Sequence, residues 1–194
     1  MMPPPKKGPI DSVIALLKRA PNAEPQVGQT PHSVVWSENK WRLLHFAPPG
    51  DRRRFDTPIL LVPSLINRWY VLDLGPGRSM IEWLVAKGHD VFCIDWGTPG
   101  DEDRYLTWDD IGGRYLGRAI RKVAAATGSD VHVLGYCLGG TITTAYVAAF
   151  PEHVATLTAL AAPIDFAHAG IMSTWTRTPT FDVGAITSAF GNVP

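Results

Sequence analysis

Apolar and polar positions change period repeatedly along the chain, and the changes predict strands and helices in alternation. Four short runs are predicted as strands, and the first of them has the continuous apolar character of a strand buried on both faces. They are Ile59–Val62, Asp90–Ile94, Val131–Leu134 and Val154–Ala162. Three further segments repeat apolar residues at helical spacing, namely Ser79–Lys87, Ile111–Val123 and Leu138–Phe150. This alternation favours an α/β fold with a mostly parallel sheet and flanking helices.

The two ends of the chain have a different character. Ser33–Phe46 alternates loosely around Glu38-Asn39-Lys40, which is typical of a hairpin. Residues 1–32 are rich in Pro, Lys, Asn and Gln, and we expect a mobile N-terminal arm there. Residues 165–194 show no clear period, so the core of the domain is predicted to span residues 33–164.

Two helix boundaries carry recognisable capping signals. Thr107-Trp108-Asp109-Asp110 resembles a capping box, in which the first and last side chains satisfy each other's backbone N–H groups. Gly88 follows the helix predicted at Ser79–Lys87 and suits its C-terminal cap.

Composition and charge exclude several classes of protein. The 194 residues include 18 basic and 18 acidic side chains, and zero net charge argues against a broad nucleic-acid surface or a polybasic membrane anchor. No window approaches the length of apolar sequence that a membrane span needs. Two cysteines form neither a disulfide framework nor a metal site, so we expect a cytoplasmic protein without a metal or cofactor.

The sharpest local signal is the sequence from Gly135 to Gly140, Gly-Tyr-Cys-Leu-Gly-Gly. It follows a predicted strand directly and precedes a predicted helix. This is the pattern of a nucleophile elbow, with Cys137 in place of the usual serine. Because strand and helix backbones nearly collide at such a turn, small residues are needed on both sides, and Gly135 and Gly139 supply the room.

The same position suits attack on a carbonyl group. At a helix N-terminus, Cys137 would face unpaired N–H groups and the positive end of the helix dipole, which favour the thiolate. The backbone N–H of Leu138 would point at the oxyanion that forms during the attack. A second N–H donor is expected from the loop after Ile59–Val62, where the amide of Ile66 or Leu65 could serve.

Other interpretations of these residues stay open. A cysteine between glycines can be a small apolar filler, although strand, turn and helix in this order favour the nucleophile. Cys93 lies within an apolar strand, and we expect it to pack in the core. Ser64 lacks flanking glycines and follows Pro63, so it suits an elbow poorly. Asp95 and Trp96 are expected to shape the site rather than to react.

Several separated motifs, taken in order, resemble the polyhydroxyalkanoate synthases. They are Leu61–Leu74, Pro76–Ser79, Asp95–Gly97, Gly135–Gly140, Pro163–Phe166 and Phe181–Pro194. The resemblance runs from about residue 34 to residue 194. The short segment before the first central strand is similar to the catalytic subunit of the two-subunit class III synthases.

The resemblance implies an α/β-hydrolase fold and a cysteine-dependent acyltransferase. Such an enzyme polymerises 3-hydroxyacyl-CoA thioesters into a polyester such as poly(3-hydroxybutyrate) and releases CoA. It implies that Cys137 is the nucleophile, that Leu138 supplies an oxyanion amide, and that residues 165–194 begin a cap. A second synthase subunit, a homo-oligomer and a place at the surface of cytoplasmic polyester granules are further implications.

One feature of the family is missing from this sequence. Family members continue well beyond this length, and their catalytic Asp and His lie on later loops. We therefore expect the N-terminal portion of a synthase, with a sheet that is incomplete on its C-terminal side. Two alternatives stay open, namely an esterase or thioesterase of the same fold, and a catalytically incomplete chain with only a structural or interaction role.

Overall fold

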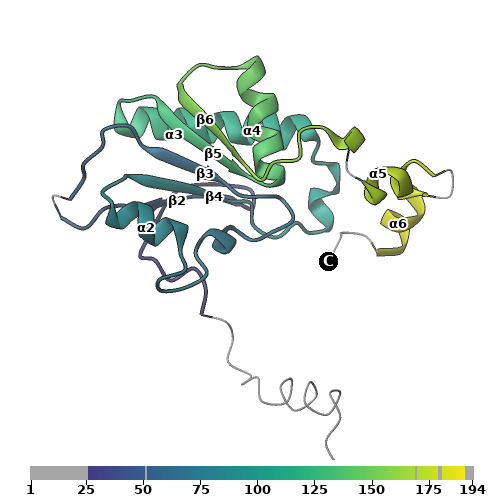
Figure 1. Cartoon of the computed structure of the whole chain (residues 1–194), viewed down its shortest axis with the longest axis horizontal. Helices are drawn as coiled ribbons and strands as arrows, with labels where there is room; N and C mark the ends of the chain where they lie inside the picture. Colours follow the sequence, from purple (N-terminus) through teal and green to yellow (C-terminus); the bar gives the residue numbers. More distant parts are fainter. Residues whose placement is uncertain (1–25, 51, 169, 179–180, 191–194) are drawn as a thin grey trace, which may run out of the picture.

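A six-stranded sheet forms the centre of the computed structural model, which describes residues 26–50, 52–168, 170–178 and 181–190 (Figure 1). Its strands lie in the order β1-β2-β4-β3-β5-β6. Along the chain they are β1 (Ser33–Glu38), β2 (Trp41–Phe46), β3 (Ile59–Val62), β4 (Val91–Asp95), β5 (Val131–Tyr136) and β6 (Val154–Leu160). The β1–β2 and β2–β4 pairs are antiparallel, whereas β4, β3, β5 and β6 are parallel, so the predicted hairpin and mostly parallel sheet are confirmed.

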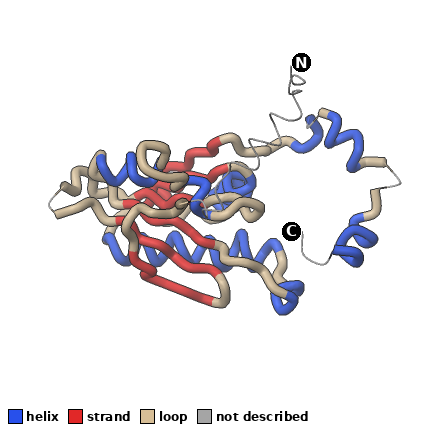
Figure 2. The backbone as a smooth tube through the Cα atoms, turned by 90° about the horizontal axis from the view of Figure 1, so that it is seen from below, coloured by secondary structure: helices blue, strands red, loops and turns tan. Residues whose placement is uncertain are grey.

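The described helices cover both faces of this sheet, except for those that follow β6 in the chain (Figure 1 and Figure 2). Along the chain they are the 3-10 helix η1 (Trp69–Leu72), α2 (Met80–Ala86), the 3-10 helix η2 (Asp101–Tyr105), the π-helix η3 (Asp109–Tyr115), α3 (Leu116–Thr127), α4 (Leu138–Ala149), the 3-10 helix η4 (Phe166–His168), α5 (Ile171–Thr176) and α6 (Val183–Phe190). Because alternate side chains of a strand point to opposite faces, Leu60 and Val62 of β3 pack under α3 and α4. Ile59 and Leu61 pack under η1 and α2 on the other face.

Side-chain caps begin two of the helices, and the sequence predicts the second of them. The Ser79 hydroxyl accepts the Glu82 N–H at 2.9 Å at the start of α2. In the predicted capping box, the Thr107 N–H donates to the Asp110 carboxylate at 2.9 Å, and the Asp110 N–H donates to the Thr107 hydroxyl at 3.2 Å. Gly88, with φ +93°, follows α2 in the left-handed region that favours glycine.

The helix predicted at Ile111–Val123 has two parts in the structure. The first part, η3, starts two residues before the predicted helix and is wound as a π-helix, and α3 begins only at Leu116. Gly112 lies in η3, where a Cβ atom would come within 3.4 Å of the Ile142 side chain of α4. Over seven residues an α-helix and a π-helix differ too little for a hydrophobic pattern to distinguish them.

The segment after β6 forms short helices where the sequence shows no clear period. α5 has six residues and α6 has eight, which is less than the window in which a helical period becomes visible. They lie beyond the end of the sheet rather than on either face (Figure 1). Apolar side chains on them are exposed, with Ile171 84% and Trp175 54% accessible. Whether this region begins a cap stays a prediction.

Residues 26–32, the described end of the predicted arm, are hydrogen-bonded to the core. The Thr30 N–H and hydroxyl both donate to the Asp73 carboxylate at 2.9 Å, and Asp73 is only 1% exposed. His32 packs against two aromatic rings, one of β2 and one of η1. Residues 1–25 of the arm lie outside the described residues.

Replacing Thr30 by valine is expected to lower the free energy of unfolding by about 1.5–3 kcal/mol, because the buried Asp73 carboxylate loses a hydrogen-bond donor. Urea denaturation of the purified chain measures this change. Thr187→Val is the control, since this exposed hydroxyl bonds only carbonyls of its own helix, and its effect should stay within about 0.5 kcal/mol. Equal losses in the two variants would contradict the prediction.

Candidate functional site

Cys137 occupies a sharp turn between the end of β5 and the start of α4. Its backbone angles, φ 53° and ψ −126°, lie in a region that residues other than glycine rarely adopt. The Cys137 N–H donates to the Leu160 carbonyl of β6 at 2.9 Å, and its carbonyl accepts the Gly140 N–H at 2.8 Å. The side chain is partly exposed. The strand, turn and helix predicted for the elbow are therefore present.

Three glycines permit this turn. A Cβ atom on Gly135 would lie 2.5 Å from the Gly140 Cα atom, and one on Gly140 would lie 2.5 Å from the Ala162 side chain. A Cβ atom on Gly139 would lie 2.6 Å from the Pro63 carbonyl oxygen at the end of β3. Separations below 3 Å are steric clashes, so the elbow glycines are required for the close approach of β5, α4 and the loop after β3.

The sequence predicts that two backbone amides, those of Leu138 and Ile66, converge on an oxyanion. In the structure the two amides have different environments. Leu138 is the first residue of α4, so its N–H has no acceptor within the helix. The Ile66 N–H donates to the hydroxyl of Ser64 at 3.1 Å, and Ser64 is fully buried. A substrate oxygen must therefore displace the Ser64 hydroxyl to reach the Ile66 N–H. Both catalytic assignments stay predictions.

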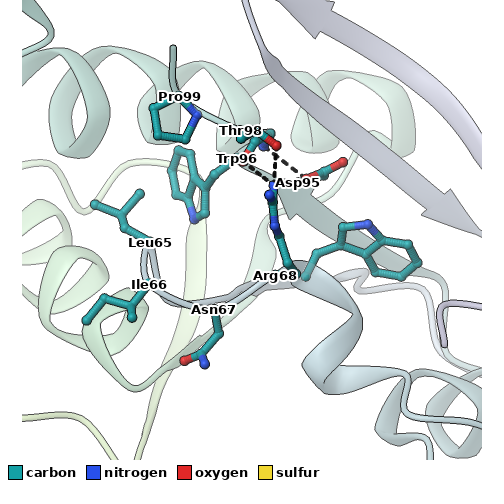
Figure 3. A pocket seen from close by; sticks show the side chains of 10 residues that line it. Leu65, Ile66, Asn67, Arg68, Asp95, Trp96, Thr98 and Pro99 are labelled. Carbon is teal, nitrogen blue, oxygen red and sulfur yellow. Dashed lines mark hydrogen bonds between the residues drawn. The ribbon is translucent and has the colours of Figure 1, made fainter. Parts of the chain in front are cut away.

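The loop that carries Ile66 is fastened to the loop after β4. The Trp96 indole N–H donates to the Pro63 carbonyl at 2.9 Å. The Arg68 guanidinium donates to the Gly97 carbonyl at 3.0 Å and to the Thr98 hydroxyl at 2.5 Å (Figure 3). These bonds hold the backbone around Ile66 at both ends of the loop.

A pocket of about 560 Å³ lies between these two loops, at the carboxyl ends of β3 and β4. Residues Leu65–Trp69 line one side and Asp95–Pro99 the other (Figure 3). Gly139 of the elbow abuts Pro63 at the start of the first loop, so the pocket neighbours the elbow. Open parallel sheets bind their ligands at this edge. Asp95 and Trp96, which the sequence predicts to shape the site, lie in the wall of this pocket.

The second cysteine is in a different environment. Cys93 lies in β4 with no exposed surface, which confirms its predicted place in the core. Burial raises the pKa of the Cys93 thiol well above its ordinary value, and the negative charges of Asp95 and Asp73 raise it further. Cys93 is therefore a protonated thiol at neutral pH.

The histidine side chains that the structure describes each have a polar partner or a ring contact, and the buried Nδ1 atom of His89 has no hydrogen-bond partner among the described residues. They are His32 with the Thr30 carbonyl, His45 with Asp90, His89 stacked on Phe55, His132 with Thr156, and His153 near Asp130. Within the described ranges, no group of three or more His, Cys, Asp or Glu side chains could hold a metal ion. No helix in that part of the chain is long and apolar enough to cross a membrane.

Sequence reasoning missed two residues that build the site. Arg68 binds groups 29 and 30 positions further along the chain, and the Ser64 hydroxyl holds the Ile66 amide. The only sequence signal for Arg68 is its place after a strand that ends at the functional edge.

Two family models match the chain. Residues 57–183 match the alpha/beta hydrolase fold, and residues 20–84 match the N-terminus of poly-beta-hydroxybutyrate polymerase (PhaC). The first match covers more than half of the chain, and the second covers about a third of it.

Relatives in two organisms are poly(3-hydroxyalkanoate) polymerase subunits PhaC. The chain is 43% identical to that of Haloferax mediterranei over 188 residues, which cover 95% of this chain and 38% of the relative. It is 37% identical to that of Allochromatium vinosum over 177 residues, which cover 89% of this chain and 49% of the relative. The chain therefore spans less than half the length of these relatives.

A solved structure has a similar fold. The Bacillus licheniformis lipase BlEst2, in its propeptide form, matches with a TM-score of 0.55 and 18% sequence identity. The match covers 78% of this chain and 30% of the lipase chain. At this identity the likeness concerns the fold alone.

Gly139→Ala is expected to lower the free energy of unfolding by about 3 kcal/mol or more, because the new Cβ atom would clash with the Pro63 carbonyl. Urea denaturation measures it. Gly113→Ala in η3 is the matched control, since nothing lies within 4 Å of that Cβ position. There alanine should raise the stability by about 0.5–1 kcal/mol. A Gly139→Ala chain as stable as the control contradicts the clash.

Alkylation should distinguish the two cysteines. In the native chain at pH 8, iodoacetamide is expected to modify the partly exposed Cys137 and to leave Cys93 free, because a raised pKa and burial both protect it. Peptide mass spectrometry locates the label. Cys137→Ala should take up label only after denaturation. A label on Cys93 in the native protein contradicts this expectation.

Proposed function

The chain belongs to the alpha/beta hydrolase fold family, and we propose that it is the N-terminal portion of a cysteine acyltransferase that makes polyhydroxyalkanoate from 3-hydroxyacyl-CoA. The observation that carries the proposal is the strained position of Cys137 in a glycine-flanked turn, in a chain whose relatives are named poly(3-hydroxyalkanoate) polymerases. The fold alone would equally suit many hydrolases.

In the proposed reaction, the Cys137 thiolate attacks the carbonyl carbon of the thioester. A carbon–sulfur bond forms to Cys137, and the carbonyl oxygen becomes an oxyanion that accepts hydrogen bonds from the Leu138 and Ile66 N–H groups. Collapse of this intermediate breaks the bond to the CoA sulfur, and CoA leaves with a proton. The hydroxyl of another monomer or of the growing polyester then attacks the acyl-cysteine. This step forms an ester bond, breaks the carbon–sulfur bond to Cys137, and passes the hydroxyl proton to the histidine that the rest of the polymerase would supply.

Ser64 has a part in this scheme. Its hydroxyl accepts the Ile66 N–H at 3.1 Å. An oxyanion is a stronger acceptor than a neutral hydroxyl, so the N–H turns to the substrate only when negative charge develops. The bonds from Trp96 and Arg68 keep the rest of the loop in place during this exchange.

The remaining partners belong to the same proposal. The histidine that takes the Cys137 proton, and its aspartate, would come from the part of the polymerases that this chain does not span. Exposed apolar side chains on α5 and α6, such as Ile171 and Trp175, suit a cap that excludes water from the acyl-cysteine. A second synthase subunit, a homo-oligomer and a place at cytoplasmic polyester granules complete the proposal.

The test incubates the 194-residue chain, and any longer product of its reading frame, with 3-hydroxybutyryl-CoA. We expect CoA release and a hydroxybutyryl group on the Cys137 peptide, detected by mass spectrometry, with the faster reaction in a longer product that supplies the histidine. Cys137→Ala should lower the rate by a factor on the order of 10⁴. Cys93→Ala, a change in the buried core thiol, is the matched control and should keep the activity.

The product identifies the final acceptor. Insoluble polyester supports the polymerase, whereas free 3-hydroxybutyrate as the sole product contradicts it and favours the thioesterase. If the wild type and Cys137→Ala release CoA at equal rates, both in the 194-residue chain and in the longer product, the protein has only a structural or interaction role.

A further inference from the structure

A second pocket lies beside the first, between the β1–β2 turn, the loops after β3 and β4, and η3. Its volume is about 160 Å³. Its apolar wall consists of Trp41, Leu65, Trp96, Leu106, Ile111 and Tyr115. We call it the Trp41 pocket.

The Trp41 pocket adjoins the proposed acylation site. Leu65 and Trp96 line both this pocket and the larger one (Figure 3). Leu65 also directly precedes Ile66, the proposed oxyanion donor. A molecule in the Trp41 pocket therefore lies against Leu65, the residue next to the proposed oxyanion donor.

Trp41, one residue of this wall, has a buried and unpaired hydrogen-bond donor. The residue is 2% exposed, and its indole N–H is buried without an acceptor among the described residues. Two other polar side chains of the wall do have partners. The Asn39 amide donates to the Tyr115 hydroxyl at 2.5 Å, and the Lys40 ammonium pairs with Asp103 at 3.2 Å. Because buried donors are almost always paired, an unpaired one in a pocket points to a ligand with an acceptor oxygen.

The size and charge of the pocket limit the ligand. An apolar cavity of about 150 Å³ accommodates a benzene-sized molecule, so one four-carbon hydroxyacyl unit fits and a CoA molecule does not. The carboxylates of Asp103 and Glu102 both pair with Lys40 at the rim, which leaves this cluster with a net negative charge. An anion would meet this charge and would lose its hydration in an apolar wall. A neutral ester suits the pocket better than a free acid.

We propose that the Trp41 pocket binds one 3-hydroxyacyl ester unit of the growing polyester, with the Trp41 indole N–H donating to its carbonyl oxygen. The inference rests on the proposed function, because the reacting carbonyl must lie at Cys137. The carbonyl that accepts from Trp41 then belongs to a neighbouring unit of the polyester. Such a contact holds the polyester beside the nucleophile between additions.

The test titrates methyl 3-hydroxybutyrate into ¹⁵N-labelled protein that carries Cys137→Ala, so binding is observed without chemistry. Nuclear magnetic resonance follows the seven tryptophan indole N–H signals. The Trp41 signal, identified by its loss in Trp41→Phe, is expected to shift on binding. Trp41→Phe should weaken the ester's affinity about three- to tenfold, the effect of one hydrogen bond.

Trp36 is the matched control. Its indole N–H is also buried without an acceptor among the described residues, but Trp36 lines a different pocket. Its signal should stay in place, and Trp36→Phe should keep the affinity. Ile111→Phe fills the Trp41 pocket without removing the indole, and it should weaken binding with the Trp41 signal still visible. This second variant tests the pocket even if Trp41→Phe does not fold.

An unmoved Trp41 signal at saturating ester, or equal binding of the 3-hydroxybutyrate anion, overturns the inference. Two mixed outcomes separate it from the proposed function. If the ester shifts the Trp41 signal but Cys137 is never acylated by 3-hydroxybutyryl-CoA, the pocket stands and the proposed function fails. If Cys137 is acylated but the Trp41 signal does not move, the proposed function stands and the pocket assignment fails.

Discussion

The site depends on one steric constraint, which is the close backbone contact between the elbow and the end of β3. Gly139 lies against the Pro63 carbonyl, and Gly135 lies against Gly140, at separations that admit no side chain. This contact brings the N-terminus of α4 to the loop after β3. Cys137 and the Ile66 amide belong to chain segments about 70 residues apart, and the contact places both segments at one edge of the sheet.

A set of hydrogen bonds then makes this edge rigid. Trp96 holds the Pro63 carbonyl, and Arg68 bridges to the loop after β4, so the loop beside the elbow is supported at both ends. Reactive groups that are held by such supporting contacts need little rearrangement when charge develops. The two pockets share Leu65 and Trp96, so the same supports shape both of them.

The sequence predicted those parts of the fold that follow from local patterns. The run Ile59–Val62 is apolar throughout because both of its faces are covered. The helix start at Thr107 was predictable because its hydrogen bonds with Asp110 form within four residues of the chain. The elbow glycines were also predictable, because the turn itself demands them. The bond from Trp96 to Pro63 spans 33 positions, and no local pattern encodes it. Trp41 resembled any alternating hairpin residue, since its missing hydrogen-bond partner is visible only once the elements are packed.

The backbone of Cys137 has a consequence for how this protein can evolve. A side chain held at φ 53° and ψ −126° costs on the order of 1–3 kcal/mol, which glycine at the same position would largely avoid. The residue that presents the sulfur is therefore a less favourable choice for folding than glycine. Selection for thermal robustness alone would replace it, so its retention in a lineage would mark selection for chemistry at the expense of stability.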